Sequence, residues 1–342
     1  MSGRVDISSI MDVHTLAAEN GTLTVATIEL LTKCNWRCQH CYLPSHVDEG
    51  LSKNVIFDVL DQLRDLGCFE LALTGGEIFY REDCMDIIRK ARELGFSVFL
   101  LTNISMLDES KIKELADLYI SNISCSIFSL DEDIHDSITG VKGSLRKALE
   151  NIMLIKKFNI PLQVKTPIMN KNFECLEEIE NFCDEHKLGY KVDYNILPQN
   201  DGNMKPRDFM LSGKQMKCII PYADMLVGYK SRVREAEEYV CPSIRHSLYI
   251  DSQGYIYPCN RLLDNVGNVS SSSIGDIWIN SSKLTIFKNM KWKDSVECSS
   301  CVDNKYCVRC PGVALLEAGG LFSKYKSACD VAKTRRCLME SE

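Results

Sequence analysis

Residues 24–42 read TVATIELLTKCNWRCQHCY, and this stretch decides the fold. Its first part, 24–31, is an apolar, β-branched run of strand length, which predicts a buried strand. Its second part places Cys34, Cys38 and Cys41 on the loop that leaves this strand. Three thiolates so close together can ligate three irons of one iron–sulfur cluster, which normally takes four cysteines. The fourth iron would then be free to bind a substrate or cofactor.

Two other interpretations fit the same three cysteines. A structural zinc site would need a distant fourth ligand, because zinc takes four. The cysteines could also be free thiols buried in the core. His40 stands directly beside Cys41 and is not expected to ligate the same metal. The chain has 17 cysteines among 342 residues and no secretion signal, which favours metal-binding thiolates over disulfides.

Beyond this stretch, apolar strand-length runs alternate with segments of helical period as far as residue 196. This alternation predicts a parallel sheet, either open or closed into a barrel, with ligands at the carboxyl ends of its strands. Six units are fewer than the eight of a full barrel. We expect strands at 24–31, 69–73, 96–101, 122–128, 162–167 and 191–196, and helices at about 52–67, 83–94, 109–119, 144–158 and 173–187.

Composition excludes several classes of protein. No apolar run is long enough to cross a bilayer, and residues 1–20 lack the basic start and apolar stretch of a signal peptide. We therefore expect a cytoplasmic protein without membrane contact. The net charge of −7 argues against a nucleic-acid partner.

The last 102 residues differ from the rest, because they hold eight cysteines among many turn residues. They follow a polar connection at about 198–234. Such a segment is typical of a small domain held by metal more than by a core. The paired CxxC units, taken alone, would also fit a zinc ribbon.

The motif Cys34-x3-Cys38-x2-Cys41-Tyr42, followed after the second strand by Thr74-Gly75-Gly76-Glu77, resembles the radical S-adenosylmethionine (SAM) superfamily. The resemblance implies that SAM chelates the open iron of a [4Fe–4S] cluster. Bare glycine backbone would let main-chain groups reach its amino group. The polar residues at the third and fourth strand ends are equally compatible with local capping. The SAM contacts implied are Tyr42, Gly75, Gly76, Glu77, Asn103 and Ser126.

The C-terminal cysteines resemble the SPASM extension of this superfamily, a seven-cysteine region that carries two auxiliary [4Fe–4S] clusters. Cys307 and Cys310 are two residues apart, where the family usually has three. The resemblance assigns Cys241, Cys259 and Cys310 to the first auxiliary cluster, and Cys298, Cys301, Cys307 and Cys329 to the second. The fourth ligand of the first cluster is left open between Cys337, another residue and the substrate.

Six further cysteines fit no ligand spacing and are expected to pack mostly as small buried hydrophobes. They are Cys68, Cys84, Cys125, Cys175, Cys183 and Cys218. Cys218 lies outside the regular strand–helix units, and it is our candidate for a hydrogen-atom donor.

The predicted fold is α/β, with a partial (β/α)6 TIM-like barrel followed by a small cysteine-rich iron–sulfur domain. We divide the chain into an N-terminal extension (1–24), the barrel (25–197), a bridging region (198–240) and the auxiliary-cluster domain (241–342).

The resemblance implies an enzyme that uses a 5′-deoxyadenosyl radical to install a thioether or carbon–carbon crosslink in a ribosomally made peptide. The implied partners are the peptide, a flavodoxin or ferredoxin-type reductant and a separate leader-binding protein, because little chain precedes the first strand. The alternatives are a sulfatase-maturase-like or small-alcohol dehydrogenase, and a non-catalytic zinc or electron-transfer protein.

Overall fold

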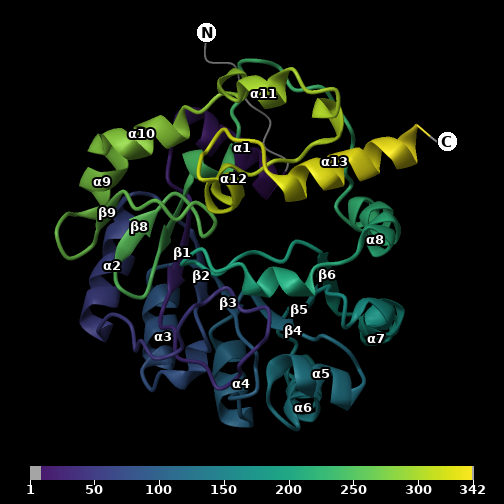
Figure 1. Ribbon diagram of the computed structural model, residues 1–342. Coiled ribbons are helices and arrows are strands. Elements are labelled where there is room, and N and C mark those ends of the chain that lie inside the picture. Colours follow the sequence, from purple (N-terminus) through teal and green to yellow (C-terminus); the bar gives the residue numbers. More distant parts are fainter. Residues whose placement is uncertain (1–8, 341–342) are drawn as a thin grey trace.

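Nine strands form one continuous sheet in the order β6-β5-β4-β3-β2-β1-β7-β8-β9 (Figure 1). The computed structural model describes residues 9–340. The strands are β1 (Val25–Glu29), β2 (Glu70–Thr74), β3 (Ser97–Leu101), β4 (Asn122–Ser126), β5 (Leu162–Pro167), β6 (Gly189–Asp193), β7 (Ser247–Ile250), β8 (Tyr255–Tyr257) and β9 (Gly267–Asn268).

The first six strands run parallel and pair in chain order, as the alternation of strands and helices predicted. Helices connect them on the outside of the curved sheet, which confirms the α/β partial barrel (Figure 1). These helices are α2 (Lys53–Asp65), α3 (Cys84–Glu93), α4 (Glu109–Asp117), α5 (Glu132–Thr139), α6 (Ser144–Lys157) and α7 (Leu176–His186).

Alternating burial explains how the sheet positions a site. In β2, Leu71 and Leu73 are fully buried against the helices, so the intervening residues face the inside of the barrel. On α2, Ile56, Val59 and Leu63 form the buried face, at the helical spacing expected from the sequence. The apolar core therefore lies between sheet and helices, which leaves the inner strand ends for polar side chains.

Four features differ from the sequence-based expectation. Helix α5 was not among the expected helices, although the Asp131 side chain caps its start. Strand β7 pairs in parallel with β1, so the sheet continues into the cysteine-rich region and does not end at six strands. Helix α8 (Gly213–Leu226) occupies the expected polar connection, because a capping box of Ser212 and Gln215 starts an amphipathic segment there. Helix α1 (Ile10–Asn20) lies within the expected N-terminal extension, of which residues 1–8 fall outside the described residues. The four domain ranges remain predictions.

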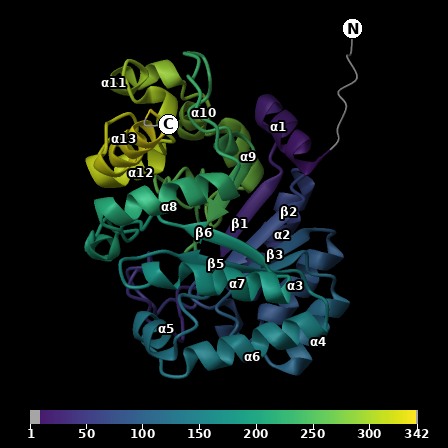
Figure 2. The same ribbon diagram turned by 90° about the vertical axis from the view of Figure 1, so that its right-hand side faces the viewer.

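The C-terminal part adds short helices that Figures 1 and 2 both place above the barrel strands. Within residues 9–340, no helix combines the length and the apolar character that crossing a bilayer requires. The helices are α9 (Ile274–Asn280), α10 (Ser282–Lys288), α11 (Val296–Ser299), α12 (Pro311–Ala318) and α13 (Lys326–Met339).

Candidate cluster and cofactor site

A cavity of about 200 Å³ lies at the carboxyl ends of the barrel strands, where the topology predicted a site. The cysteine loop after β1 forms one wall, and the last residues of β2, β3 and β4 form another. The cavity brings together eight of the residues predicted from sequence: Cys34, Cys38, Cys41, Tyr42, Gly75, Gly76, Asn103 and Ser126.

The cysteine loop is held by main-chain hydrogen bonds to the end of α5. Arg37 N–H donates to the Thr139 carbonyl over 2.8 Å, and Gln39 N–H donates to the Ile138 carbonyl over 3.0 Å. The pKa of the Cys41 thiol is raised to about 11, mainly by burial and in smaller part by the neighbouring Cys34 thiol. The thiols are therefore neighbours in a poorly solvated place, and a metal that binds them would displace their protons.

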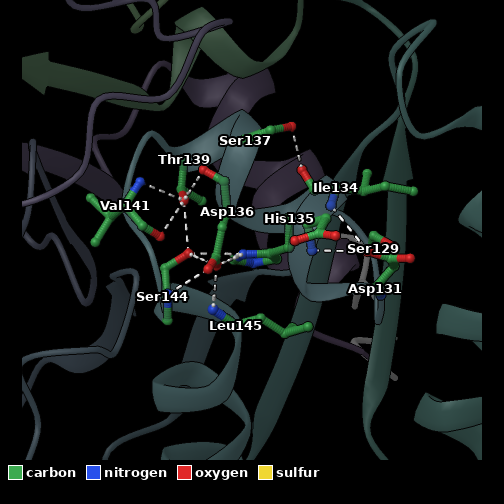
Figure 3. Close-up of polar contacts among 12 residues, drawn as sticks. Ser129, Asp131, Ile134, His135, Asp136, Ser137, Thr139, Val141, Ser144 and Leu145 are labelled. Carbon is green, nitrogen blue, oxygen red and sulfur yellow. Dashed lines mark hydrogen bonds and ion pairs between the residues drawn. The ribbon is translucent and has the colours of Figure 1, made fainter.

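A polar network beneath the loop fixes α5 against α6 (Figure 3). The Asp136 carboxylate accepts hydrogen bonds from Ser144 Oγ at 2.7 Å and from Leu145 N–H at 3.1 Å. His135 is fully buried, its Nδ1 lies 3.0 Å from Ser144 Oγ, and its ring packs edge-on against Trp36. Burial lowers the pKa of His135 to about 4, so this ring is neutral and supports the loop structurally.

The two glycines after β2 allow the chain to press against the loop after β1. A Cβ on Gly76 would stand 2.2 Å from the Lys33 carbonyl oxygen, and one on Gly75 would stand 2.4 Å from that of Leu31. Gly76 N–H donates to the Leu31 carbonyl over 2.9 Å. Because no side chain fits here, this backbone forms a closely packed cradle at the cavity wall.

Glu77 is placed differently from the other predicted SAM contacts. Its side chain is 0% exposed and does not line the cavity. Its carboxylate accepts hydrogen bonds from Thr102 Oγ1 and Asn103 N–H at 2.7 Å each, and from Phe79 N–H at 3.0 Å. Glu77 therefore positions the end of β3. Asn103 Nδ2 in turn donates to Asn35 Oδ1 at 2.8 Å on the cysteine loop.

Among the cavity residues that were not predicted as site residues, three have basic side chains: His40, His46 and Lys165. His40 is half-buried, its buried Nδ1 has no hydrogen-bond partner among residues 9–340, and desolvation lowers its pKa to about 4. His46 Nε2 lies 3.5 Å from Cys41 Sγ. Lys165 is the one Lys or Arg among the described lining residues, and burial lowers its pKa. Only Lys165 carried a signal in the sequence, since it lies near the end of a predicted strand.

Of the seven C-terminal cysteines that the resemblance assigned, Cys241, Cys259 and Cys310 lie near one another and the other four line one cavity, while their roles as cluster ligands remain predictions. Burial raises the pKa of Cys259 to about 11, and the neighbouring thiols of Cys310 and Cys241 add to this shift. Burial likewise raises the pKa of Cys307 to about 11, with added effects from Cys298 and Cys329. A cavity of about 180 Å³ is lined by all four cysteines of the second group: Cys298, Cys301, Cys307 and Cys329.

Ten cysteines thus form groups of three, three and four, and their thiol chemistry fits iron–sulfur clusters. Within residues 9–340, no three His, Cys, Asp or Glu side chains converge on a single-ion site, so the fit rests on donor type and grouping.

The remaining cysteines lie apart from these groups. Cys337 and Cys218 are exposed, and Cys218 does not line the cavity at the cysteine loop. The structure therefore does not bring the candidate hydrogen-atom donor to the other predicted site residues. The five that are buried, as expected, are Cys68, Cys84, Cys125, Cys175 and Cys183.

Comparison with known proteins places both regions in families. The profile of the radical SAM superfamily matches residues 28–185, and that of the SPASM iron–sulfur cluster-binding domain matches residues 241–302. An AdoMet-dependent heme synthase of Methanosarcina barkeri is 25% identical over 85% of this chain and 92% of its own. A PqqA peptide cyclase of Bradyrhizobium diazoefficiens is 24% identical over 84% of this chain and 82% of its own.

Solved structures share the fold across almost the whole chain. SuiB of Streptococcus suis, bound to S-adenosylmethionine, gives a TM-score of 0.70 at 15% identity and covers 96% of this chain and 82% of its own. The structure of anSMEcpe with bound AdoMet gives a TM-score of 0.68 at 15% identity, and it covers 93% of this chain and 96% of its own. The family matches at residues 28–185 and 241–302 show that the chain carries a radical SAM domain followed by a SPASM iron–sulfur cluster-binding domain.

Proposed function

We propose that this enzyme matures a ribosomally made peptide by installing a thioether or carbon–carbon crosslink. The observation that carries the proposal is the cavity where the cysteine loop, the Gly75–Gly76 backbone and the strand-end residues Asn103 and Ser126 meet. A peptide substrate is supported by the relative named PqqA peptide cyclase. It is also supported by the structure of SuiB bound to precursor peptide SuiA. The fold of that structure matches this chain with a TM-score of 0.70.

In this proposal, Cys34, Cys38 and Cys41 hold a [4Fe–4S] cluster. When bound, the cluster and SAM supply a 5′-deoxyadenosyl radical that removes a hydrogen atom from an unactivated carbon. The remaining cavity residues would bind and orient SAM and the substrate, and they would exclude water. Glu77 would act indirectly, because its carboxylate holds the Asn103 main chain at the end of β3. The direct SAM contacts are Tyr42, Gly75, Gly76, Asn103 and Ser126.

The SPASM cysteines would hold two auxiliary clusters, and these would supply a site that can take up an electron during substrate oxidation. The first, on Cys241, Cys259 and Cys310, lacks a fourth cysteine. Cys337 lies near the end of α13, and its side chain is exposed. Cys310 lines a cavity of about 370 Å³, which gives a substrate atom room beside this group. The substrate is therefore the better candidate for the open position.

One observation favours a second candidate function. The relative named heme synthase matches this chain as well as the peptide cyclase does, at 25% against 24% identity, so a small organic substrate is the main competitor of a peptide. The product would also distinguish a sulfatase-maturase-like oxidation and a small-alcohol oxidation from a peptide crosslink, because each of these reactions yields a different product. A zinc or electron-transfer protein would form no 5′-deoxyadenosine at all.

The proposal includes a flavodoxin or ferredoxin-type reductant and a separate leader-binding protein. All 17 cysteines are free of disulfides, which suits a reducing, cytoplasmic setting.

The test is anaerobic incubation of the reconstituted enzyme with SAM, a reductant and any small peptide found to be encoded beside its gene. We expect 5′-deoxyadenosine and a peptide lighter by two hydrogen atoms, because one crosslink removes one hydrogen from each joined atom. The control variant Glu93→Gln lies at an exposed position on α3, outside every cavity described above, and should behave like the wild type. An unchanged peptide in the presence of 5′-deoxyadenosine formation would contradict the peptide assignment.

A further inference from the structure

A groove of about 1240 Å³ runs between the start of α8 and the start of α13. The turn at Lys205–Phe209 and the end of α12 close its sides. Figure 2 shows α12 and α13 above α8, and the ion pair of Arg335 with Asp224 joins α13 to α8 at its far end. We call this the α8–α13 groove.

The α8–α13 groove is positively charged, although the chain carries a net charge of −7. Two of its cations are paired, Arg207 with Glu317 and Lys326 with Asp330. Lys324 lies 3.8 Å from Glu297. The lining contains six cationic side chains against two anionic ones: Arg207, Lys214, Lys217, Lys324, Lys326 and Lys333 against Glu317 and Asp330.

Three lysines supply the unbalanced charge. Lys214, Lys217 and Lys333 are exposed, and none has a carboxylate partner within 4.0 Å in the described part of the chain. They come from two different helices and face one groove, so the positive potential adds up there. This arrangement favours a ligand that carries several negative charges.

The groove also has an apolar component. Met204, Met210 and Met216 line it, and methionine side chains adapt to partners of varied shape. A free inorganic anion would use the lysines but not these side chains. An extended chain with both acidic and apolar residues would use both.

The groove leads inward to the predicted first auxiliary site. It shares Asn195, Arg207, Met210 and Tyr325 with the neighbouring cavity of about 370 Å³, which reaches Cys310. Tyr325 Oη accepts a hydrogen bond from Cys310 N–H at 2.7 Å at this junction. A chain bound in the groove can therefore continue toward the cluster cysteines without leaving a cavity.

We infer that the α8–α13 groove binds an acidic segment of the peptide substrate, apart from the residues that are crosslinked. The inference rests on the proposed function, since it takes the substrate to be a peptide. Recognition at this groove would give the enzyme leader selectivity through the bridging region and α13.

The test measures binding to the reconstituted enzyme by fluorescence anisotropy, without SAM or turnover. The probe is a short labelled peptide of alternating Glu and Leu, and the comparison peptide replaces every Glu with Gln. We expect the Glu peptide to bind at least about tenfold more tightly at low salt, with the difference shrinking as salt is added.

The deciding variant is Lys214→Glu, Lys217→Glu and Lys326→Glu together, which keeps Lys333 because that side chain also lines the cavity of the second cysteine group. It should weaken binding of the Glu peptide by about 30-fold or more, while iron content and circular dichroism stay as in the wild type. The matched control reverses three lysines on α4 and around the start of α6, as Lys113→Glu, Lys142→Glu and Lys147→Glu, and changes the net charge equally. It should retain binding.

Three results would overturn the inference: equal affinity for the Glu and Gln peptides, equal affinity in the groove variant and the wild type, or equal loss in both triple variants. These results concern binding, whereas the proposed function is tested by the mass change of the natural peptide. Failure of the inference and failure of the proposed function can therefore be distinguished.

Discussion

The cysteine loop of the barrel and the cysteine groups of the SPASM region offer the same donor atom, sulfur. The loop is attached to a large apolar core, whereas the SPASM groups lie in a segment with little core of its own. The loop leaves β1 from a sheet whose apolar core is complete without metal, with Leu30 and Leu31 fully buried at its base. Residues 296–310, by contrast, form one four-residue helix and short turns. In the barrel the fold positions the thiols, whereas in the SPASM region the metal must help to hold the fold.

Exposed side chains in the SPASM region support this difference. Val296, Val302 and Val308 surround the CxxC units and are 73%, 78% and 55% exposed. These valines contribute little burial, so the segment gains little hydrophobic stabilisation of its own. Small metal-bound segments of this kind take their folding free energy from metal binding.

The largest effect is therefore expected from replacing Cys298, Cys307 and Cys329 together with alanine. Without its ligands the C-terminal segment loses a metal contribution that reaches about 10 kcal/mol in small metal-folded domains. Hydrogen exchange across residues 290–339 should rise sharply, while the barrel strands stay protected. The matched comparison is the alanine triple at Cys34, Cys38 and Cys41, which should leave exchange in both regions nearly unchanged. Unfolding of the barrel in the first variant would contradict the contrast between the regions.

An intermediate effect is expected from Gly76→Ala at the barrel site. The added methyl group would meet the Lys33 and Thr32 carbonyl oxygens at 2.2 and 2.4 Å, so the cysteine loop must shift. We expect a loss of about 1–3 kcal/mol in the free energy of unfolding and a SAM cleavage rate lower by at least about 100-fold. Gly213→Ala is the control, because a Cβ there meets nothing within 4 Å. Wild-type cleavage in Gly76→Ala would show that the cradle does not position SAM.

The smallest effect concerns the hydrogen bond that joins the two regions. Tyr249 Oη on β7 donates to Glu29 Oε2 on β1 over 2.7 Å. Burial, with a smaller contribution from Asp251, raises the pKa of Glu29 above its ordinary value of 4.5, although the Tyr249 bond opposes this. The folded state therefore holds a proton that the unfolded state has lost, and stability falls as pH rises from about 4.5 through the raised pKa.

Glu29→Gln keeps an acceptor for Tyr249 and removes the buried charge. In urea unfolding of the apo protein, the variant should gain stability relative to the wild type as pH rises, and the two should be closest below pH 4.5. Glu93→Gln, at an exposed position, should follow the wild type at every pH. A constant difference between Glu29→Gln and the wild type would mean that Glu29 is not protonated by burial.

Local patterns in the sequence were enough to predict the barrel. The strands β1 to β6 and the helices α2, α3, α4, α6 and α7 follow from periodicity, and the cysteine loop and Gly75–Gly76 follow from spacing and resemblance. Helix α5 was not predicted. Long-range pairing was not predictable, because nothing local states that Ser247–Ile250 adds to β1. Helix α8 was missed because Pro221 and its polar approach hid an amphipathic segment.

Side-chain direction was the other limit. Glu77 belongs to a recognisable motif, yet its carboxylate turns away from the cavity to hold β3. His40 and His46 reach the cavity only because of the path of the loop after Cys38. Such placements depend on tertiary packing, which spacing along the chain does not encode.

The most direct measurement is iron content and 5′-deoxyadenosine formation in the alanine triple at Cys34, Cys38 and Cys41, after anaerobic reconstitution. We expect SAM cleavage to disappear and about four irons per chain to be lost, while the iron held by the SPASM cysteines remains. Retained SAM cleavage, or loss of all iron at once, would contradict the assignment of the open cluster to the loop after β1.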